Sequence, residues 1–159
     1  MKNLLIILAI TLGLSCCKND DDTPKNPIDQ LPPPTQTGEN TFGFLINGQP
    51  ISITNSSQMA AIYQGGFIQF GSGGVYIVLD EPFEINNNYN LVGKVRYVED
   101  NGQESCYYDF NDSYEGFVNF SRIDKTNFIV SGSFEFSTVT DNCEIVNITN
   151  GRFDMQYIP

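Results

Sequence analysis

Apolar and polar residues alternate along the chain from residue 41 onward, in short segments separated by turn residues. Phe42, Phe44 and Ile46 begin this pattern, and the Asn47-Gly48 pair that follows them is typical of a tight hairpin turn. A period of two is typical of strands that have one buried face and one face in water. Strands are predicted at residues 42–46, 51–53, 59–63, 67–70, 75–79, 91–98, 104–110, 114–123 and 128–140.

Turn residues between these segments indicate how the strands are connected. Asp100-Asn101-Gly102 favours a hairpin, whereas residues 80–90 contain Pro82 and three consecutive asparagines and are expected to form a loop. Residues 144–157 fit either a final hairpin around Asn150-Gly151 or one bulged strand. About eight to ten strands joined in this way predict an all-β fold, either an antiparallel β-sandwich or a small β-barrel.

The N-terminus has a different pattern, because residues 4–14 are a continuous apolar run that follows Lys2. Eleven helical residues rise about 16 Å, roughly half of a bilayer's hydrocarbon core. The run is therefore expected to be a signal peptide, residues 1–16. It ends in Leu14-Ser15-Cys16-Cys17, which resembles the lipobox of bacterial lipoproteins.

Two registers of this lipobox are possible. Cys17 as the lipidated residue puts Leu14 at the favoured apolar position, whereas Cys16 puts Ser15 before the cleavage site. We expect Cys17 to be lipidated, with Cys16 as the alternative. Acyl chains such as palmitate contribute about 0.8 kcal/mol per buried methylene, so several chains would attach the protein firmly to a membrane.

Residues 17–40 are expected to form an acidic, proline-rich tether ahead of an all-β domain at residues 41–159. The proline residues favour extended polyproline conformation, with a reach on the order of 70 Å for the whole tether. Lys18 and the acidic run at residues 20–22 resemble the surface-export signal of Bacteroidota lipoproteins. We therefore expect an outer-membrane lipoprotein exposed on the cell surface, with a periplasm-facing lipoprotein as the alternative.

Composition limits the chemistry of the domain. The formal net charge is −11 with only eight Lys plus Arg residues, which disfavours binding to nucleic acid. The chain has no histidine, which excludes Ser-His-Asp and Cys-His nucleophile activation and removes the commonest zinc ligand. No cofactor or metal is expected, and an enzyme is not expected.

Two cysteines, Cys106 and Cys143, remain within the predicted domain. Beyond the inner membrane disulfides persist, so we expect these two residues to form one. Two separate buried thiols are the alternative. A reactive cysteine is disfavoured because no histidine is present to lower its pKa.

Tyrosines and carboxylates are the remaining candidates for a site. Tyr107 and Tyr108 are adjacent, so on a strand they face opposite sides and one of them is expected to be exposed. With Tyr89, Tyr97 and Tyr114 it could provide a surface for sugar rings or a protein partner. Most other aromatic residues are expected in the core. Acidic residues cluster in three places, and each cluster is interpreted as solvated turn charges: residues 80–84, 99–100 and 109–115.

Several motifs also resemble a family of Bacteroidota lipoproteins that carry a β-rich domain of unknown function. The matching stretches are residues 31–38 (LPPPTQTG), 40–43 (NTFG), 130–136 and 147–154. Pro34 departs from the family pattern, which has small residues there, and one additional residue lies between Phe44 and Asn47. The resemblance implies secretion, lipidation and an all-β fold, but no activity and no catalytic residues.

These observations favour a lipid-anchored envelope or surface protein with a non-enzymatic binding or structural role. Its expected partners are the membrane, through the N-terminal lipid, and an unidentified protein or glycan. A small-ligand carrier with a barrel cavity is the main alternative. A hydrolase that uses paired carboxylates is the third possibility.

Overall fold

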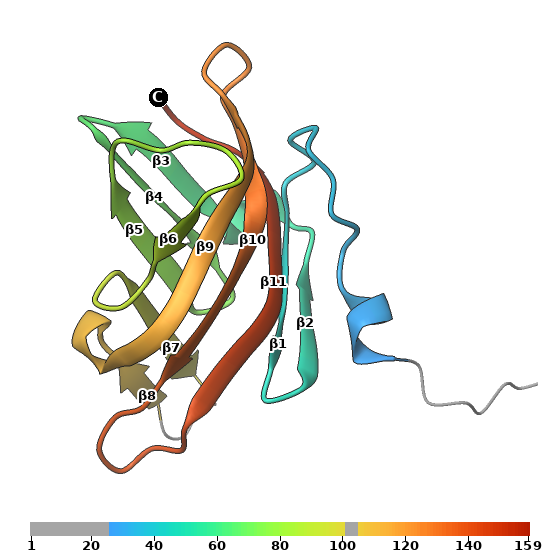
Figure 1. The fold of residues 1–159 in the computed structure, drawn as a ribbon. Helices are drawn as coiled ribbons and strands as arrows, with labels where there is room; N and C mark the ends of the chain where they lie inside the picture. Colours follow the sequence, from blue (N-terminus) through green and yellow to red (C-terminus); the bar gives the residue numbers. More distant parts are fainter. Residues whose placement is uncertain (1–25, 101–104) are drawn as a thin grey trace, which may run out of the picture.

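The computed structural model describes residues 26–100 and 105–159 (Figure 1). The predicted signal peptide, both candidate lipidation sites, Cys16 and Cys17, and the first part of the tether lie outside the described residues, as does the Asn101-Gly102 turn. No helix among the described residues is long and apolar enough to cross a membrane.

The fold is an antiparallel β-sandwich of two sheets, which confirms the first of the two predicted architectures (Figure 1). The six-stranded sheet has the order β2-β1-β11-β10-β9-β6, and the five-stranded sheet has the order β3-β4-β5-β7-β8. The strands are β1 (Thr41–Ile46), β2 (Gln49–Ile53), β3 (Ala60–Gln64), β4 (Phe67–Ser72), β5 (Val75–Asp80), β6 (Asn88–Asn90), β7 (Val95–Asp100), β8 (Ser105–Tyr108), β9 (Ser113–Asp124), β10 (Ile129–Thr138) and β11 (Val146–Gln156). The described residues also contain three short 3-10 helices: η1 (Pro27–Gln30) precedes β1, whereas η2 (Ser56–Gln58) and η3 (Phe110–Asp112) connect strands.

Two details of the strands differ from the sequence predictions or decide between them. The described residues contain β6, a three-residue strand paired with β9, within the stretch that was expected to be a loop. A strand of three residues is too short to show a recognisable alternation of apolar and polar residues. It forms a strand because it pairs with β9. At the C-terminus, β11 is one bulged strand, because its register with β10 shifts next to Asn150, which has a φ of 53°. A bulge with a residue of positive φ is a common way to accommodate one extra residue.

The core lies between the sheets and is rich in phenylalanine. Val130, Phe134 and Phe136 alternate on β10 and are all buried, as the pattern predicts. Gly132 occupies the inward position between them and is paired with Phe153 of β11. A Cβ at Gly132 would lie 2.1 Å from the Asn119 carbonyl oxygen and 2.8 Å from the Phe153 ring, so this position requires glycine. Large rings on one strand therefore fill the space that glycine leaves on the next.

Residues 31–40, which we call the N-terminal strap, pack against the six-stranded sheet beside β1 and β2 (Figure 1). Leu31 is 6% exposed, and a Cβ at Gly43 of β1 would lie only 2.4 Å from the Pro32 ring. Arg152 of β11 donates a hydrogen bond to the Pro32 carbonyl oxygen at 3.0 Å. The part of the chain that packs against the sheet therefore begins before residue 41, the expected start of the domain, and already includes Leu31.

One carboxylate, that of Asp154 on β11, holds most of the N-terminal strap. It is 1% exposed, and it also accepts a hydrogen bond from a serine of β10. Its donors are Thr35 Oγ1 at 2.7 Å, Thr37 N at 3.0 Å, Gly38 N at 2.8 Å, Glu39 N at 3.2 Å and Ser131 Oγ at 2.7 Å. The path of the strap is thus set by its own N–H groups, which surround the buried Asp154 carboxylate. Its sequence shows no periodic pattern of apolar residues.

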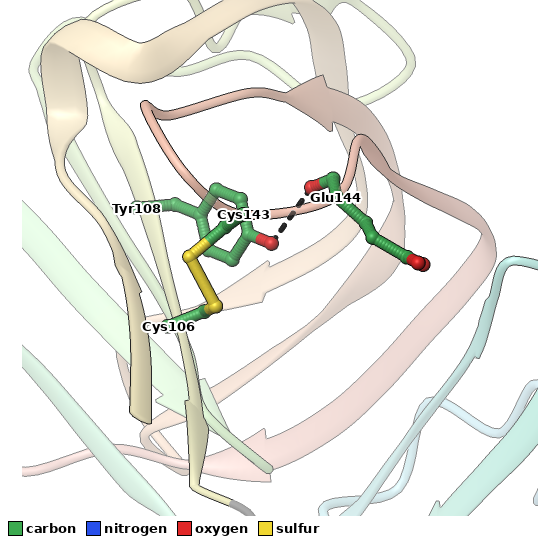
Figure 2. The surroundings of a disulfide bond; sticks show 4 residues. All are labelled: Cys106, Tyr108, Cys143 and Glu144. Atoms are coloured by element: carbon green, nitrogen blue, oxygen red, sulfur yellow. Dashed lines mark hydrogen bonds between the residues drawn. A yellow bond between two sulfur atoms is a disulfide. The ribbon is translucent and has the colours of Figure 1, made fainter. Parts of the chain in front are cut away.

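A disulfide bond joins Cys106 and Cys143, as predicted, with their Cα atoms 6.1 Å apart (Figure 2). Cys106 lies on β8 of the five-stranded sheet, and Cys143 lies in the connection between β10 and β11 of the six-stranded sheet. Beside the bond, the Tyr108 hydroxyl donates to the Glu144 carbonyl oxygen at 2.8 Å. The two sheets are therefore joined at one end by a covalent bond and a hydrogen bond.

Candidate functional site

The outer face of the five-stranded sheet carries a shallow groove with a volume of about 610 Å³. We call it the Arg96 groove. Strand alternation produces it, because Val75, Ile77 and Leu79 of β5 point into the core and leave the residues between them outside. The lining residues are Gln69, Tyr76, Val78, Asp80, Gly93, Lys94, Arg96 and Phe110.

Arg96 is held between aromatic side chains in this groove. Its guanidinium carbon lies 4.6 Å from the centre of the Tyr76 ring and 5.7 Å from that of Phe110. Its Nη1 donates to the Tyr107 hydroxyl at 3.0 Å. Cation–π contacts and a hydrogen bond restrict the orientation of the side chain, so the guanidinium is fixed before any ligand arrives.

The aromatic residues around Arg96 are themselves held in place. Tyr76 is directly opposite Arg96 in the β5–β7 pairing, and its hydroxyl donates to Gln69 Oε1. Phe110 begins η3, whose N-terminus is capped reciprocally by Asp109 and Asp112. Phe110 then meets Tyr76 edge-on, with 6.1 Å between the ring centres. The groove is therefore built from both β pairing and a capped turn.

Two of the cations in the described structure, Lys94 and Arg96, line this groove. Elsewhere among the described residues, Arg122 pairs with Asp124 at 2.5 Å and Lys125 pairs with Glu81 at 3.1 Å. Arg152 has a backbone partner, the Pro32 carbonyl oxygen. Across residues 26–100 and 105–159, neither Lys94 nor Arg96 forms a salt bridge, and both line the groove. Asp80 is the carboxylate in the lining, so two cations face one anion and the groove has a local excess of positive charge in a chain of formal charge −11. Such a feature favours an anionic ligand.

The structure separates the three tyrosines Tyr107, Tyr108 and Tyr114 that were candidates for a binding surface. Tyr107 is 49% exposed at the edge of the Arg96 groove, and Tyr114 is 49% exposed on β9 of the other sheet. Tyr108 is 0% exposed, because successive residues of β8 face opposite sides and its ring packs inward at 5.9 Å from that of Tyr97. Tyr108 is therefore a core residue and not part of a binding surface.

Sequence reasoning missed Tyr76, Arg96 and Phe110. Their signal was present in the alternation, since Tyr76 lies between buried Val75 and Ile77 on β5, and Arg96 lies between buried Val95 and Tyr97 on β7. The pairing of β5 with β7 places them opposite each other across a 14-residue connection, and sequence alone does not specify this register. Phe110 lies beside Tyr76 and Arg96 only because η3 places it there.

The acidic clusters have structural partners. Asp109 and Asp112 form the capping box of η3, and Glu84 accepts a hydrogen bond from Asn87 Nδ2 at 2.7 Å. Glu81 accepts from the Tyr63 hydroxyl and pairs with Lys125, and these contacts lower its pKa. In the part of the chain that the structure describes, no group of three or more His, Cys, Asp or Glu side chains could hold a metal ion.

A second depression, of about 590 Å³, lies between β2 and β7. It is lined by Ile46, Ile51 and Ile53 on one side and by Tyr97 and Glu99 on the other. Burial, with a smaller contribution from the negative charge of Glu99, raises the pKa of Tyr97 to about 12. The Tyr97 hydroxyl therefore stays neutral at any physiological pH, and the depression is mainly apolar.

No protein-family model, curated protein or solved structure matches this chain. The function must therefore be argued from the residues and their geometry.

Proposed function

We propose that this protein is a lipid-anchored envelope protein, displayed on the cell surface, that binds a ligand through the Arg96 groove without converting it. The observation that carries the proposal is the oriented, unneutralised Arg96 between Tyr76 and Phe110 on an open sheet face. Immobilised aromatic and arginine side chains are typical of binding hot spots. Nothing in the packing of the core requires a cation at this position.

The attachment to the membrane rests on the N-terminal sequence. Cys17, or alternatively Cys16, would carry the acyl chains, and Lys18 with residues 20–22 would direct export to the surface. Because the N-terminal strap packs on the sheet and η1, which precedes it, contacts β2, residues 18–26 are the part left to separate the domain from the lipid. Nine residues reach at most about 30 Å. The domain would therefore lie close to the membrane.

A binding role agrees better with the site than catalysis does. The carboxylates of two acidic clusters are engaged in a helix cap and in an ion pair with Lys125. Asp80 is the carboxylate that lines the groove, and glycosidase mechanisms use two facing carboxylates. The groove offers fixed donors and rings, which orient a ligand.

Photo-crosslinking on living cells tests the binding face. A photoreactive residue replaces Lys94 in the groove or, as a control, Thr126 in the exposed turn between β9 and β10. The expected result is a crosslinked adduct at position 94 that is missing at position 126. Equal labelling at both positions, or none at position 94, would contradict the proposal.

Two experiments test the attachment. An alkyne fatty acid should label the wild type and the Cys16→Ser variant and should fail to label Cys17→Ser; the reverse result would assign Cys16. Protease treatment of intact cells should remove the domain. Survival of the domain on intact cells, with digestion after lysis, would reject surface display.

A small-ligand carrier is a second candidate, favoured by the depression between β2 and β7. Its apolar wall of three isoleucines suits the hydrocarbon part of a small amphiphile. A fluorescent fatty-acid analogue should bind the wild type, and Ile51→Asp should weaken that binding. Lack of binding to the wild type would eliminate this candidate.

A further inference from the structure

We propose that the ligand of the Arg96 groove is an acidic polysaccharide, recognised through the carboxylate of a uronic-acid sugar. This inference rests on the proposed binding function and specifies its ligand class. It follows from the combination of fixed positive charge, apolar surface and hydroxyl-binding groups in one groove.

The positive charge selects an anion. Arginine presents a planar set of N–H donors that matches a carboxylate with two parallel hydrogen bonds. Among the described residues, the Tyr107 hydroxyl is the one hydrogen-bond acceptor for the Arg96 guanidinium, so donors remain for a ligand. Lys94 is exposed in the same groove and adds a second cation.

The other lining residues favour a sugar over a peptide. Asp80 is an exposed carboxylate at the groove, which would repel a run of acidic side chains but accepts hydrogen bonds from sugar hydroxyls. Gln69 also lines the groove, and its side-chain NH₂ can donate while its oxygen accepts from Tyr76. Val78 and Phe110 supply apolar surface for the C–H face of a sugar ring. Lys94 and Arg96 alone would suit inorganic phosphate equally well, but phosphate would make no use of the polar and apolar residues that also line the groove.

The groove is large enough to hold a short segment of a polysaccharide. Its volume of about 610 Å³ lies within the usual range for small-ligand sites, and it is open on the outer face of the sheet. A segment of a polysaccharide can therefore lie in it while the rest of the polymer stays in solvent, which a closed pocket would prevent. Surface display would give the groove access to such polymers.

Isothermal titration of the mature lipoprotein in detergent tests the inference. The probes are tetramers of galacturonate, mannuronate and guluronate, with tetramers of neutral galactose and of glutamate as comparisons. At least one uronate tetramer should bind about tenfold or more tightly than both comparisons, because its charge-assisted hydrogen bonds to Arg96 are absent for galactose. Failure of all three uronate tetramers to bind would overturn the inference.

Variants locate the binding. Arg96→Gln should weaken binding about tenfold or more, and Arg96→Lys should also weaken it, because lysine keeps the charge but lacks the planar donors. Arg122→Gln removes the same charge from β9 of the other sheet and should leave binding unchanged. Thermal unfolding of each variant checks that the fold is retained. Uronate binding that Arg96→Gln does not alter would overturn the inference.

The same titrations separate this inference from the proposed function. Galactose or glutamate tetramers that bind more tightly than uronates, and lose affinity in Arg96→Gln, would reject the acidic polysaccharide but keep the groove as a binding site. A second outcome would also reject only the acidic polysaccharide. In it, crosslinked adducts form at position 94, but Arg96→Gln changes the affinity for none of the tetramers.

Discussion

At the scale of single residues, Asp154 has the least ordinary environment in the described structure. Its carboxylate is 1% exposed and faces donors from two directions, the N-terminal strap and β10. Burial by itself raises the pKa of Asp154, but hydrogen bonds from Ser131, Thr35, Gly38 and Glu39 outweigh it and lower that pKa below its usual value. A buried charge is tolerated here because N–H and O–H groups replace its water.

Asp154→Asn should destabilise the protein. The asparagine side chain places an NH₂ group against donors such as Gly38 N, so at least one buried donor loses its acceptor. The expected loss is about 2 to 4 kcal/mol in the free energy of unfolding, measured by urea titration. Asp141→Asn, at an exposed position, is the matched control and should change stability little. Equal stability of the two variants would contradict this role for Asp154.

The same carboxylate predicts a pH dependence. Because the folded-state pKa of Asp154 is lowered, its contribution is complete above the ordinary aspartate value of 3.8 and is lost as the pH falls through the folded-state pKa. The stability difference between the wild type and Asp154→Asn should therefore be constant from pH 7 to about 5 and shrink below pH 3.8. Urea titrations at pH 7, 5, 4 and 3 measure it. A difference that grows on acidification would refute the assignment.

At the scale of elements, β11 is the centre of the six-stranded sheet and contacts β1, β10 and the N-terminal strap. Its bulge at Asn150 absorbs one extra residue and keeps Phe153 and Met155 in the core on the far side. The strap covers the outer face of this strand and donates to Asp154. Residues at opposite ends of the sequence therefore form one unit.

Removal of the N-terminal strap should weaken the domain. A chain that begins at Thr41 lacks the four strap donors to Asp154 and should lose about 2 to 4 kcal/mol in the free energy of unfolding relative to one that begins at Asn26. A chain that begins at Leu31 retains the strap and is the control, with stability close to that of the longer chain. Thermal and urea unfolding measure the difference. Equal stability of the Thr41 and Leu31 chains would show that the strap is not part of the folded unit.

At the scale of the whole molecule, the two sheets are held by the aromatic core and, at one end, by the Cys106–Cys143 bond (Figure 2). The bond spans 37 residues of sequence, and it secures β8, an edge strand of only four residues. Cys106 pairs with Glu99 of β7, next to the pair formed by Tyr107 and Val98. Because Tyr107 contacts Arg96, the disulfide also supports one edge of the groove.

The double variant Cys106→Ser with Cys143→Ser should lower the free energy of unfolding by about 4 kcal/mol, because the unfolded chain regains the freedom of the closed loop. A reducing agent should produce a similar loss in the wild type and no further loss in the variant. Hydrogen exchange should increase in β8 more than in β10. Wild-type stability that is insensitive to reduction would contradict a structural role for the bond.

The sequence alone was sufficient for the all-β class, for most strands and for the disulfide, because these depend on local alternation, turn residues and the number of cysteines in the domain. It also predicted one bulged strand as an alternative at Asn150-Gly151, which the structure selects. The short strand β6 and the N-terminal strap were missed, because neither carries a periodic pattern. Lipidation and surface display remain predictions from the N-terminal sequence.

Only the tertiary structure decided that the sheet forms a sandwich, that Tyr108 is buried and that Tyr76, Arg96 and Phe110 share a groove. The physical reason is the same in each case. Local alternation tells which side of a strand a residue faces, but the partner of each strand is set by packing and hydrogen bonds between residues far apart in sequence. A site made from facing residues of different strands therefore exists only once those strands have paired.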